Sequence, residues 1–304
     1  MGYQLEFNES IADGLKRILN EQLEKAIANL KGETEDKSDA VHTARKCLKK
    51  VRAIVRLLRD ELGEEVYQLE NACFRNAGKQ LSDVRDSQVL IETLDKLVSY
   101  YSDTITIDAF AGVRGILVAQ YEVLSQQMLG ENSAVEEVID ILEEARSRVN
   151  NWELKHENWG AIEFGLKRIY KQGRSRLAKA YEQPTNENFH DWRKRVKDHW
   201  YHLRILKPIW LEVMTPLANE ASLLSDYLGD DHDLAVLEDY LIQQPDKYGD
   251  RNTLEVLLSL IKRRRPQLQL AAKKIGQRLY SEKPSQFCDR ISTYWEVWQS
   301  EINP

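Results

Sequence analysis

Two basic segments of this 304-residue chain repeat one spacing of histidine, arginine and lysine. Both follow the pattern His-x-x-Arg-Lys-x-x-Lys, and their members are His42, Arg45, Lys46 and Lys49 in the first and His190, Arg193, Lys194 and Lys197 in the second. Arginine forms bidentate contacts with phosphate, and lysine supplies a compact positive charge. A histidine on the same face adds a donor whose protonation a phosphate favours. The spacing therefore indicates binding of a phosphate-rich anion.

The first segment is an amphipathic helix when residues 41–62 advance about 100° per residue. Its basic side chains then share an arc of roughly 140°; they are His42, Arg45, Lys46, Lys49, Arg52, Arg56 and Arg59. No acid lies between Val41 and Arg59, although like charges one turn apart destabilise a helix by a few tenths of a kcal/mol. Basic rows that repeat about every 5.4 Å suit a linear polyanion.

The second segment carries a matching arc with two aromatic substitutions. Its basic members are His190, Arg193, Lys194, Lys197, Arg204 and Lys207. Trp200 and Tyr201 replace Arg52 and Ala53, and this modest aromatic content favours phosphate over stacked nucleobases. Arg195, His199 and His202 fall on or near the apolar side, where we expect the arginine to pair with an acid and the histidines to be packed and hydrogen-bonded.

Further basic residues lie outside the two segments. Arg17 and Arg168 occupy a repeated Gly-Leu-Lys-Arg-Ile motif, and Lys171 and Arg174 extend the second copy of that face. We include these four as a second tier of candidate phosphate contacts. Arg75 and Lys79 also share one helix face, four residues apart, and the simplest interpretation of each is a surface charge.

The motifs recur in the same order at nearly one offset. The Gly-Leu-Lys-Arg-Ile motif is shifted by 151 residues, the histidine motif by 148, and the Asp-rich segment 81–90 by 147. The chain is therefore predicted to be an internally duplicated all-α domain over residues 1–304. Its two four-helix-bundle-like halves, about 1–151 and 158–304, are expected to be related by pseudo-two-fold symmetry. Helices are expected near 9–31, 38–61, 64–79, 86–101, 105–129, 133–151, 158–182, 187–206, 208–228, 233–244, 251–281 and 284–301.

Composition excludes several classes of protein. The net charge of −6 argues against bulk coating of DNA, although clustered charge still permits an anion site. No apolar stretch reaches the roughly 18 residues of a membrane span. The first ten residues lack a signal-peptide pattern, and the three cysteines fit neither a disulfide framework nor a zinc site. We therefore expect a cytoplasmic protein.

An acidic element is repeated as well. It comprises Asp83, Arg85 and Asp86 in the first half and Asp230, Asp231, His232 and Asp233 in the second. Such residues can bind a divalent metal, but Asp also caps helix N-termini, and we favour caps where one helix ends and the next begins. No Gly-rich phosphate loop, HExxH motif or nucleophile motif is present. We therefore predict no enzyme activity, no catalytic residues, no metal and no cofactor.

The paired histidine motifs and the repeated segments 81–90 and 228–237 resemble the CHAD family, the conserved histidine α-helical domain. The resemblance covers nearly the whole chain. It implies two four-helix bundles that bind inorganic polyphosphate in a basic central cavity, and it implies association with polyphosphate granules. The phosphate contacts that it implies are His42, Arg45, Lys46, Lys49, Arg52, Arg56, His190, Arg193, Lys194, Lys197 and Arg204. The triphosphate-tunnel domain often joined to this family is absent.

Three functions stay open on the sequence, in this order. The first is non-catalytic binding of inorganic polyphosphate in a basic groove or pore. The second is binding of a nucleic acid or nucleotide by the same faces. The third is a metal-dependent phosphohydrolase that uses the Asp and His clusters. The length of the polymer, the oligomeric state and the cellular role are not determined by the sequence.

Overall fold

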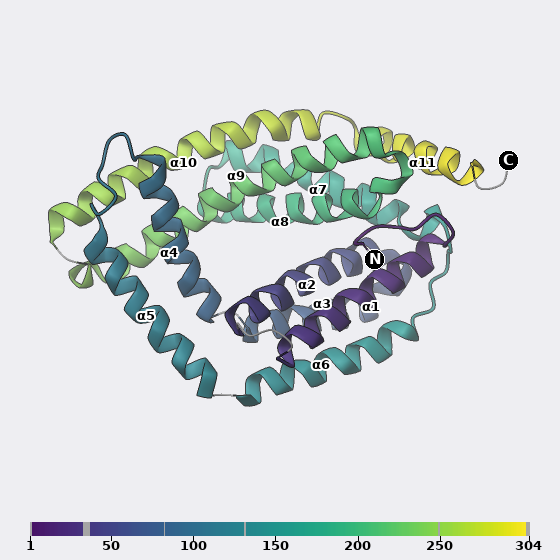
Figure 1. Cartoon of the computed structure of the whole chain (residues 1–304). Helices are drawn as coiled ribbons and strands as arrows, with labels where there is room; N and C mark the ends of the chain where they lie inside the picture. The colour runs from purple at the N-terminus through teal and green to yellow at the C-terminus, as the bar shows by residue number, and fades with distance from the viewer. Residues whose placement is uncertain (1, 33–36, 82, 131, 249, 302–304) are drawn as a thin grey trace.

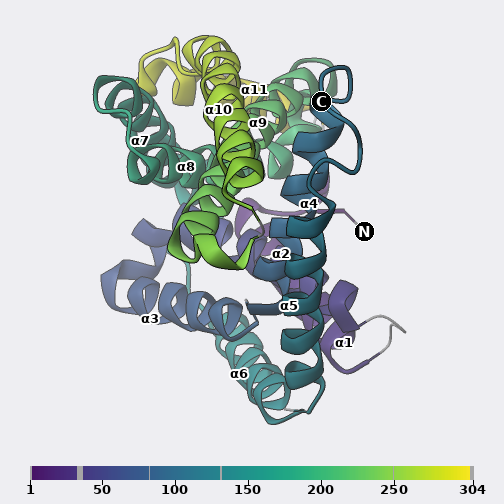
Figure 2. The same ribbon diagram turned by 90° about the vertical axis from the view of Figure 1, so that its left-hand side faces the viewer.

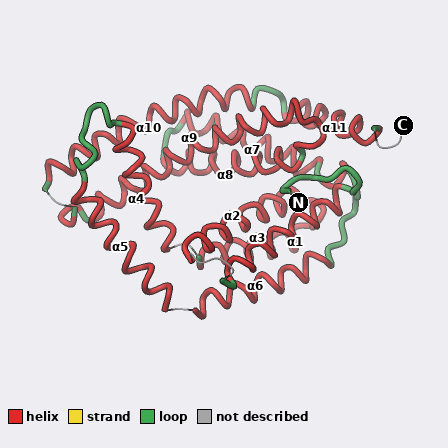
Figure 3. The backbone as a smooth tube through the Cα atoms, viewed as in Figure 1, coloured by secondary structure: helices red, strands yellow, loops and turns green. Residues whose placement is uncertain are grey.

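The computed structural model describes residues 2–32, 37–81, 83–130, 132–248 and 250–301, and these residues form helices and loops without a strand (Figures 1 and 3). The α-helices are α1 (Ile11–Leu30), α2 (Lys37–Leu57), α3 (Arg59–Gln80), α4 (Asp83–Tyr100), α5 (Ala111–Gly130), α6 (Asn132–Asn150), α7 (Glu163–Glu182), α8 (Asn186–Ile205), α9 (Leu211–Gln243), α10 (Arg251–Leu279) and α11 (Pro284–Ser300). The short 3₁₀ helices are η1 (Trp159–Ala161), η2 (Lys207–Trp210) and η3 (Pro245–Lys247). None of the described helices combines the length and apolar character needed to cross a membrane.

The helices pack in two layers that meet along α2 and α8 (Figure 1). In one layer α1 contacts α2 and α6, and α3 contacts the same two helices. In the other layer α8 lies between α7 and α9, with α10 against α9 and α11 against α7. The α4–α5 hairpin leaves the first layer and crosses to α9 at one end of the molecule (Figure 2). The two basic helices therefore lie at the junction of the layers.

Two apolar cores hold this arrangement. The larger core runs through both layers and includes Leu19 of α1, Val51 of α2 and Leu203 of α8. The smaller core joins the hairpin to the far ends of α9 and α10, through residues such as Leu94 and Leu237. Side chains of this size each contribute about 1.5 to 3 kcal/mol when fully buried. The hairpin is thus anchored to the second layer by its own apolar contacts.

Close approach of α7 to α2 depends on a glycine. A Cβ atom added to Gly165 would lie 1.8 Å from the carbonyl oxygen of Leu57, where no side chain fits. This glycine belongs to the second Gly-Leu-Lys-Arg-Ile motif. Its bare Cα lets the end of α2 contact α7 directly, and this contact fixes α2 relative to the second layer.

Most predicted helices are present, but several boundaries differ; for example, α2 ends at Leu57 rather than near residue 61, and α3 begins at Arg59 rather than near residue 64. The predicted break between residues 228 and 233 is wrong, because α9 continues unbroken from Leu211 to Gln243. Leu228, Leu234 and Leu237 are buried along that helix, so packing outweighs the local preference of Gly229 and its Asp neighbours for a helix end. Residues 105–110 and 158–162 also lie outside α-helices, since α5 begins at Ala111 and α7 at Glu163.

Candidate polyanion-binding site

Lys49 of α2 and Lys197 of α8 lie where these two helices pack at the junction of the layers, and the charge of Lys197 acts on Lys49. Burial, together with the charges of Lys197, Arg45 and Arg193, lowers the pKa of Lys49 to about 7. Burial and the charge of Arg193 lower the pKa of Lys197 to about 8, while Asp226 and Asp233 oppose the shift. Lys49 still reaches solvent, so its ammonium lies in a crowded but open recess. Neither lysine forms an ion pair with a described residue.

A pocket between α2 and α3 continues from Lys49. It has a volume of about 250 Å³. Five of its lining residues are basic and none is acidic; they are Arg45, Lys49 and Arg52 from α2 with Arg75 and Lys79 from α3. Leu48 and Phe74 supply apolar surface, and both are buried. Five cations around one small recess repel each other, so an anion that enters it is stabilised.

The other basic residues of α2 have partners of different kinds. The Arg45 guanidinium lies 3.1 Å from Asp86 of α4, which is an exposed carboxylate. The Nε of Arg52 donates to Asn71 at 3.3 Å. Burial lowers the pKa of Arg52 to about 10, and the charge of Arg56 adds to this. Lys46 is exposed, and its charge reaches both His42 and Lys197.

Both motif histidines have a lowered pKa, which favours the neutral imidazole. Burial, together with the charges of Lys194 and Arg193, lowers the pKa of His190 to about 4. The ring of His190 lies 4.3 Å from that of His232 on α9, whose pKa burial lowers to about 3. Burial also lowers the pKa of His42. A nearby anion would raise the pKa of either motif histidine and so favour its protonation.

Arg193 differs from its neighbour Lys194. Its buried Nε has no hydrogen-bond partner among the described residues, and the guanidinium packs against the bare Cα of Gly229 on α9. Lys194 instead forms an ion pair with Asp191 at 3.1 Å. Arg193 thus keeps an unsatisfied buried donor, which costs free energy in the absence of a ligand.

Four predicted contacts are engaged within the protein. Arg56 forms an ion pair with the buried Asp198 of α8 at 2.8 Å. Arg168 contacts Asp60 and donates to the carbonyl of Arg56 at 2.7 Å. Arg17 pairs with Glu9 at 2.6 Å and Glu21 at 2.9 Å. Arg204 lies over the rings of Tyr3 and Trp200, at 5.3 Å from each. These arginines hold helices and the N-terminal segment together.

Lys171 and Arg174 are exposed on α7. Arg174 lines a separate pocket of about 390 Å³ between α7 and α10, together with Tyr181 and Lys273. The structure therefore does not bring these two residues into the α2–α3 pocket, and they extend the basic surface along α7 instead.

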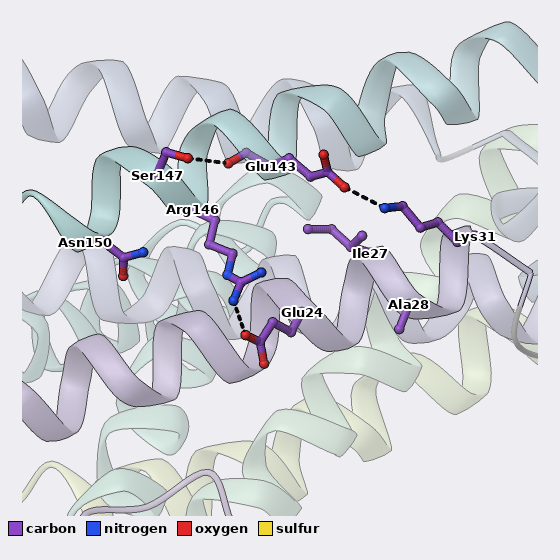
Figure 4. A pocket seen from close by; sticks show the side chains of 8 residues that line it. All are labelled: Glu24, Ile27, Ala28, Lys31, Glu143, Arg146, Ser147 and Asn150. Atoms are coloured by element: carbon purple, nitrogen blue, oxygen red, sulfur yellow. Dashed lines mark hydrogen bonds and ion pairs between the residues drawn. The ribbon is translucent and has the colours of Figure 1, made fainter.

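Another pocket, of about 550 Å³, lies between α1 and α6 (Figure 4). Its charged side chains pair with each other across the two helices. Lys31 contacts Glu143 at 2.6 Å, and Arg146 contacts Glu24. Because each cation has a carboxylate partner, this pocket has no excess positive charge for an anion.

The acidic element is divided among several partners. Asp231 is buried and accepts hydrogen bonds from Arg265 and Gln269, each at 3.0 Å. Asp230 lies 3.2 Å from Lys96 of α4. Side-chain contacts of Asp83 lie outside the described part of the structure. The described residues contain no cluster of three or more His, Cys, Asp or Glu side chains that could hold a metal ion. The predicted capping role is wrong for Asp230 to Asp233, because they lie inside α9.

The aromatic and apolar-side predictions have mixed outcomes. Tyr201 is buried against Tyr3, and Trp200 stacks on Tyr201 at 4.9 Å, so neither ring is free to stack on a base. The predicted pairing of Arg195 is confirmed, with Asp198 at 3.2 Å. His202 is packed and contacts the carbonyl of Ala53 at 2.9 Å, as predicted. His199 is buried, but the predicted hydrogen bond is wrong because neither ring nitrogen has a described partner.

Arg75 and Lys79 are the residues that sequence reasoning left outside the site. Their i, i+4 spacing shows that they share a helix face, but only the packing of α3 on α2 brings that face to Arg45 and Lys49. A helical wheel describes one helix at a time, so it does not identify the face that a neighbouring helix presents.

The described residues thus form an all-helical domain in which two basic helices lie at the junction of two layers. The model of the CHAD domain matches residues 17–242, so this chain belongs to the CHAD family. Among solved structures, PptA from Streptomyces chartreusis is similar, with a TM-score of 0.60 and 14% sequence identity. The similarity covers 90% of this chain and all of that one, and at this identity it shows the shared fold. No curated protein matches the sequence.

Proposed function

We propose that this protein binds inorganic polyphosphate without hydrolysing it, at the junction of α2 and α8 and in the α2–α3 pocket. One observation carries the proposal: Lys49 forms no ion pair with a described residue and lies within reach of the charge of Lys197, beside a pocket lined by five cations and no acid. Polyphosphate presents a negative charge on every repeating unit, so it neutralises several of these groups at once. Membership of the CHAD family supports the same ligand.

The chain is proposed to be an internal duplication with pseudo-two-fold symmetry. The repeated histidine motifs lie on α2 and α8, which contact each other, and the repeated Gly-Leu-Lys-Arg-Ile motifs lie on α1 and α7. The two helices of each equivalent pair lie in different layers, with α1 and α2 in one layer and α7 and α8 in the other. Duplication thus explains why two similar basic faces meet at one junction, which a single four-helix bundle does not provide.

Within this site the residues have distinct roles. Arg45 and Arg52 offer planar guanidinium groups for bidentate contacts, while Lys46, Lys49 and Lys197 supply point charges. His42 and His190 gain a second N–H donor and a positive charge when a phosphate approaches and favours their protonation. Arg193 places an unsatisfied buried Nε at the junction. The protein needs no cofactor for this binding, and we expect it in the cytoplasm, in association with polyphosphate granules.

A binding titration with three anions tests the proposal. Long-chain polyphosphate, tripolyphosphate and single-stranded DNA are titrated calorimetrically at two salt concentrations. We expect tight, salt-sensitive binding of long-chain polyphosphate, weaker binding of tripolyphosphate and little binding of DNA, because the junction offers cations but no free aromatic rings. Equal affinity for DNA favours the nucleic-acid alternative. Release of phosphate on addition of a divalent metal favours the hydrolase alternative.

A further inference from the structure

The helices that pack beside the two basic helices carry different charges at equivalent positions. Helix α3 packs beside α2, and helix α9 packs beside α8. Beside α2, helix α3 places Arg75 and Lys79 in the pocket with Arg45 and Lys49. The 147-residue offset of the Asp-rich segments relates Arg75 to Ser222 and Lys79 to Asp226, both on α9 beside α8. One cation of the first half is thus replaced by a neutral residue in the second half, and the other is replaced by an acid.

Asp226 belongs to a row of carboxylates on α9. Asp230 follows one turn later and Asp233 three residues after that, so the three share a face of the helix. The charges of Asp226 and Asp233 act on Lys197. The positive charges of Arg193 and Lys96 in turn act to lower the pKa of both Asp226 and Asp233. The row therefore faces the second basic segment and the end of α4.

Like charges at this spacing destabilise a helix, and the row brings no compensating direct ion pair to Lys197. Asp230 alone has a close cation, Lys96 at 3.2 Å. Burial raises the pKa of Asp226 and of Asp233, and Asp230 adds to both shifts, while Lys197, Arg193 and Lys96 oppose them. The row thus has an energetic cost in the unliganded protein, while it reduces the positive potential at Arg193 and Lys197.

We infer that Asp226, Asp230 and Asp233 make the site one-sided: polyphosphate is held at the α2–α8 junction and in the α2–α3 pocket, and the acidic row repels it from the α9 side of α8. This inference rests on the proposed function and concerns the path and selectivity of the ligand. A ligand of low charge gains little on the α9 side of α8, because each of its phosphates also approaches a carboxylate. The row therefore acts as a specificity determinant that favours anions able to span the α2–α3 pocket.

Reciprocal charge neutralisation at the two equivalent positions tests the inference. Asp226→Asn and Lys79→Gln are compared with wild type by titration of long-chain polyphosphate and of tripolyphosphate, at pH 6.5 with EDTA. Asp226→Asn is expected to tighten binding by about threefold, and Lys79→Gln to weaken it by about threefold or more, for one unit charge near the phosphates. The gain in Asp226→Asn should be larger for tripolyphosphate, since the α9 side of α8 becomes usable. Glu212→Gln, an exposed acid at the start of the same α9, controls for net charge and should leave affinity unchanged.

The outcomes separate this inference from the proposed function. If wild type binds polyphosphate and Asp226→Asn binds equally or more weakly, the acidic row does not oppose the ligand and the inference fails alone. If Glu212→Gln tightens binding as much as Asp226→Asn, the effect is one of net charge and the inference also fails. Absence of binding by wild type overturns both claims. Circular dichroism and thermal melting of each variant confirm that binding is compared between folded proteins.

Discussion

Lys49 and Lys197 illustrate how a residue can be placed for a ligand at a cost to the unliganded protein. Each has a lowered pKa because it is crowded by protein and faces other cations. An ordinary surface lysine avoids such a position or pairs with an acid, as Lys194 does with Asp191. The contrast between paired and unpaired cations distinguishes binding residues from structural ones better than the count of basic residues does.

Reversal of both unpaired charges should separate binding from folding. We expect the double variant Lys49→Glu with Lys197→Glu to lose detectable binding of long-chain polyphosphate. Its helicity and melting temperature should stay near those of wild type, because the substitutions break no described ion pair and the change at Lys49 relieves repulsion among the pocket cations. Calorimetry and thermal melting by circular dichroism measure the two effects. A collapse of the melting temperature contradicts the assignment of these lysines to a binding site.

Binding should also depend on pH in a defined direction. A lysine whose folded pKa is lowered costs stability fully below that folded pKa, and the cost disappears as the pH rises toward its unfolded pKa near 10.5. A bound phosphate restores the proton, so affinity should fall as pH rises from 7 to 9 through the pKa values of Lys49 and Lys197. The charged groups around Lys49 are Arg45, Arg52, Arg75, Lys79, Asp86, Arg193 and Lys197.

Proton uptake makes this pH dependence measurable without ambiguity. Titrations at pH 7.5 in buffers of different ionisation enthalpy should show that polyphosphate binding takes up protons. Lys49→Gln should reduce the uptake, while Lys283→Gln, a substitution at an exposed lysine before α11, should not. Binding without proton uptake contradicts the idea that the ligand restores the ammonium at Lys49.

At the scale of elements, the packing of α7 and α8 on α2 decides where the basic faces point. Gly165 brings α7 against the end of α2, and the Arg56–Asp198 pair joins α2 to α8. The sequence contains both motifs, but their roles differ from the residue-by-residue expectation. Arg56 shares the basic arc with Lys49, yet its partner is a buried acid of the other layer.

A substitution at Gly165 should therefore destabilise the fold without touching the site. Gly165→Ala is expected to lower the free energy of unfolding by about 3 kcal/mol, because its methyl group overlaps the Leu57 carbonyl. Gly115→Ala in α5 is the matched control: nothing lies within 4 Å of its added Cβ, so it should stabilise the protein by about 0.5 to 1 kcal/mol. Denaturant unfolding measures both changes in unfolding free energy. Equal changes for the two variants would contradict the claim that the contact of α7 with α2 requires glycine at position 165.

The Arg56–Asp198 pair should behave as a structural contact. Arg56→Met is expected to cost about 3 kcal/mol of unfolding free energy, because it leaves Asp198 buried with only Arg195 beside it. Asp198 is 5% exposed in its side chain, so solvent compensates little. Denaturant unfolding of Arg56→Met, of Asp198→Asn and of the double variant measures the coupling. A stable Arg56→Met that binds polyphosphate poorly would instead return Arg56 to the binding site.

At the scale of the whole molecule, the fold class and the location of the basic helices could be predicted from the sequence. The apolar residues recur at helical spacing along the chain, and the described residues accordingly form helices and loops but no strand. The continuity of α9 could not be predicted, because Gly229 and three neighbouring acids are local signals that buried leucines override. The contributions of Arg75 and Lys79 could not be placed either, since they depend on how α3 is rotated against α2.

Lysine footprinting tests most directly whether the junction is where polyphosphate binds. The protein is acetylated at pH 7.5 with and without long-chain polyphosphate, and the rate at each lysine is measured by mass spectrometry. We expect Lys49 and Lys197 to react readily when unliganded, because of their low pKa values, and at least about tenfold more slowly with ligand, as do Lys46 and Lys79. The exposed Lys247 and Lys283 should be unaffected. Uniform protection of all lysines, or none at Lys49 and Lys197, contradicts the account.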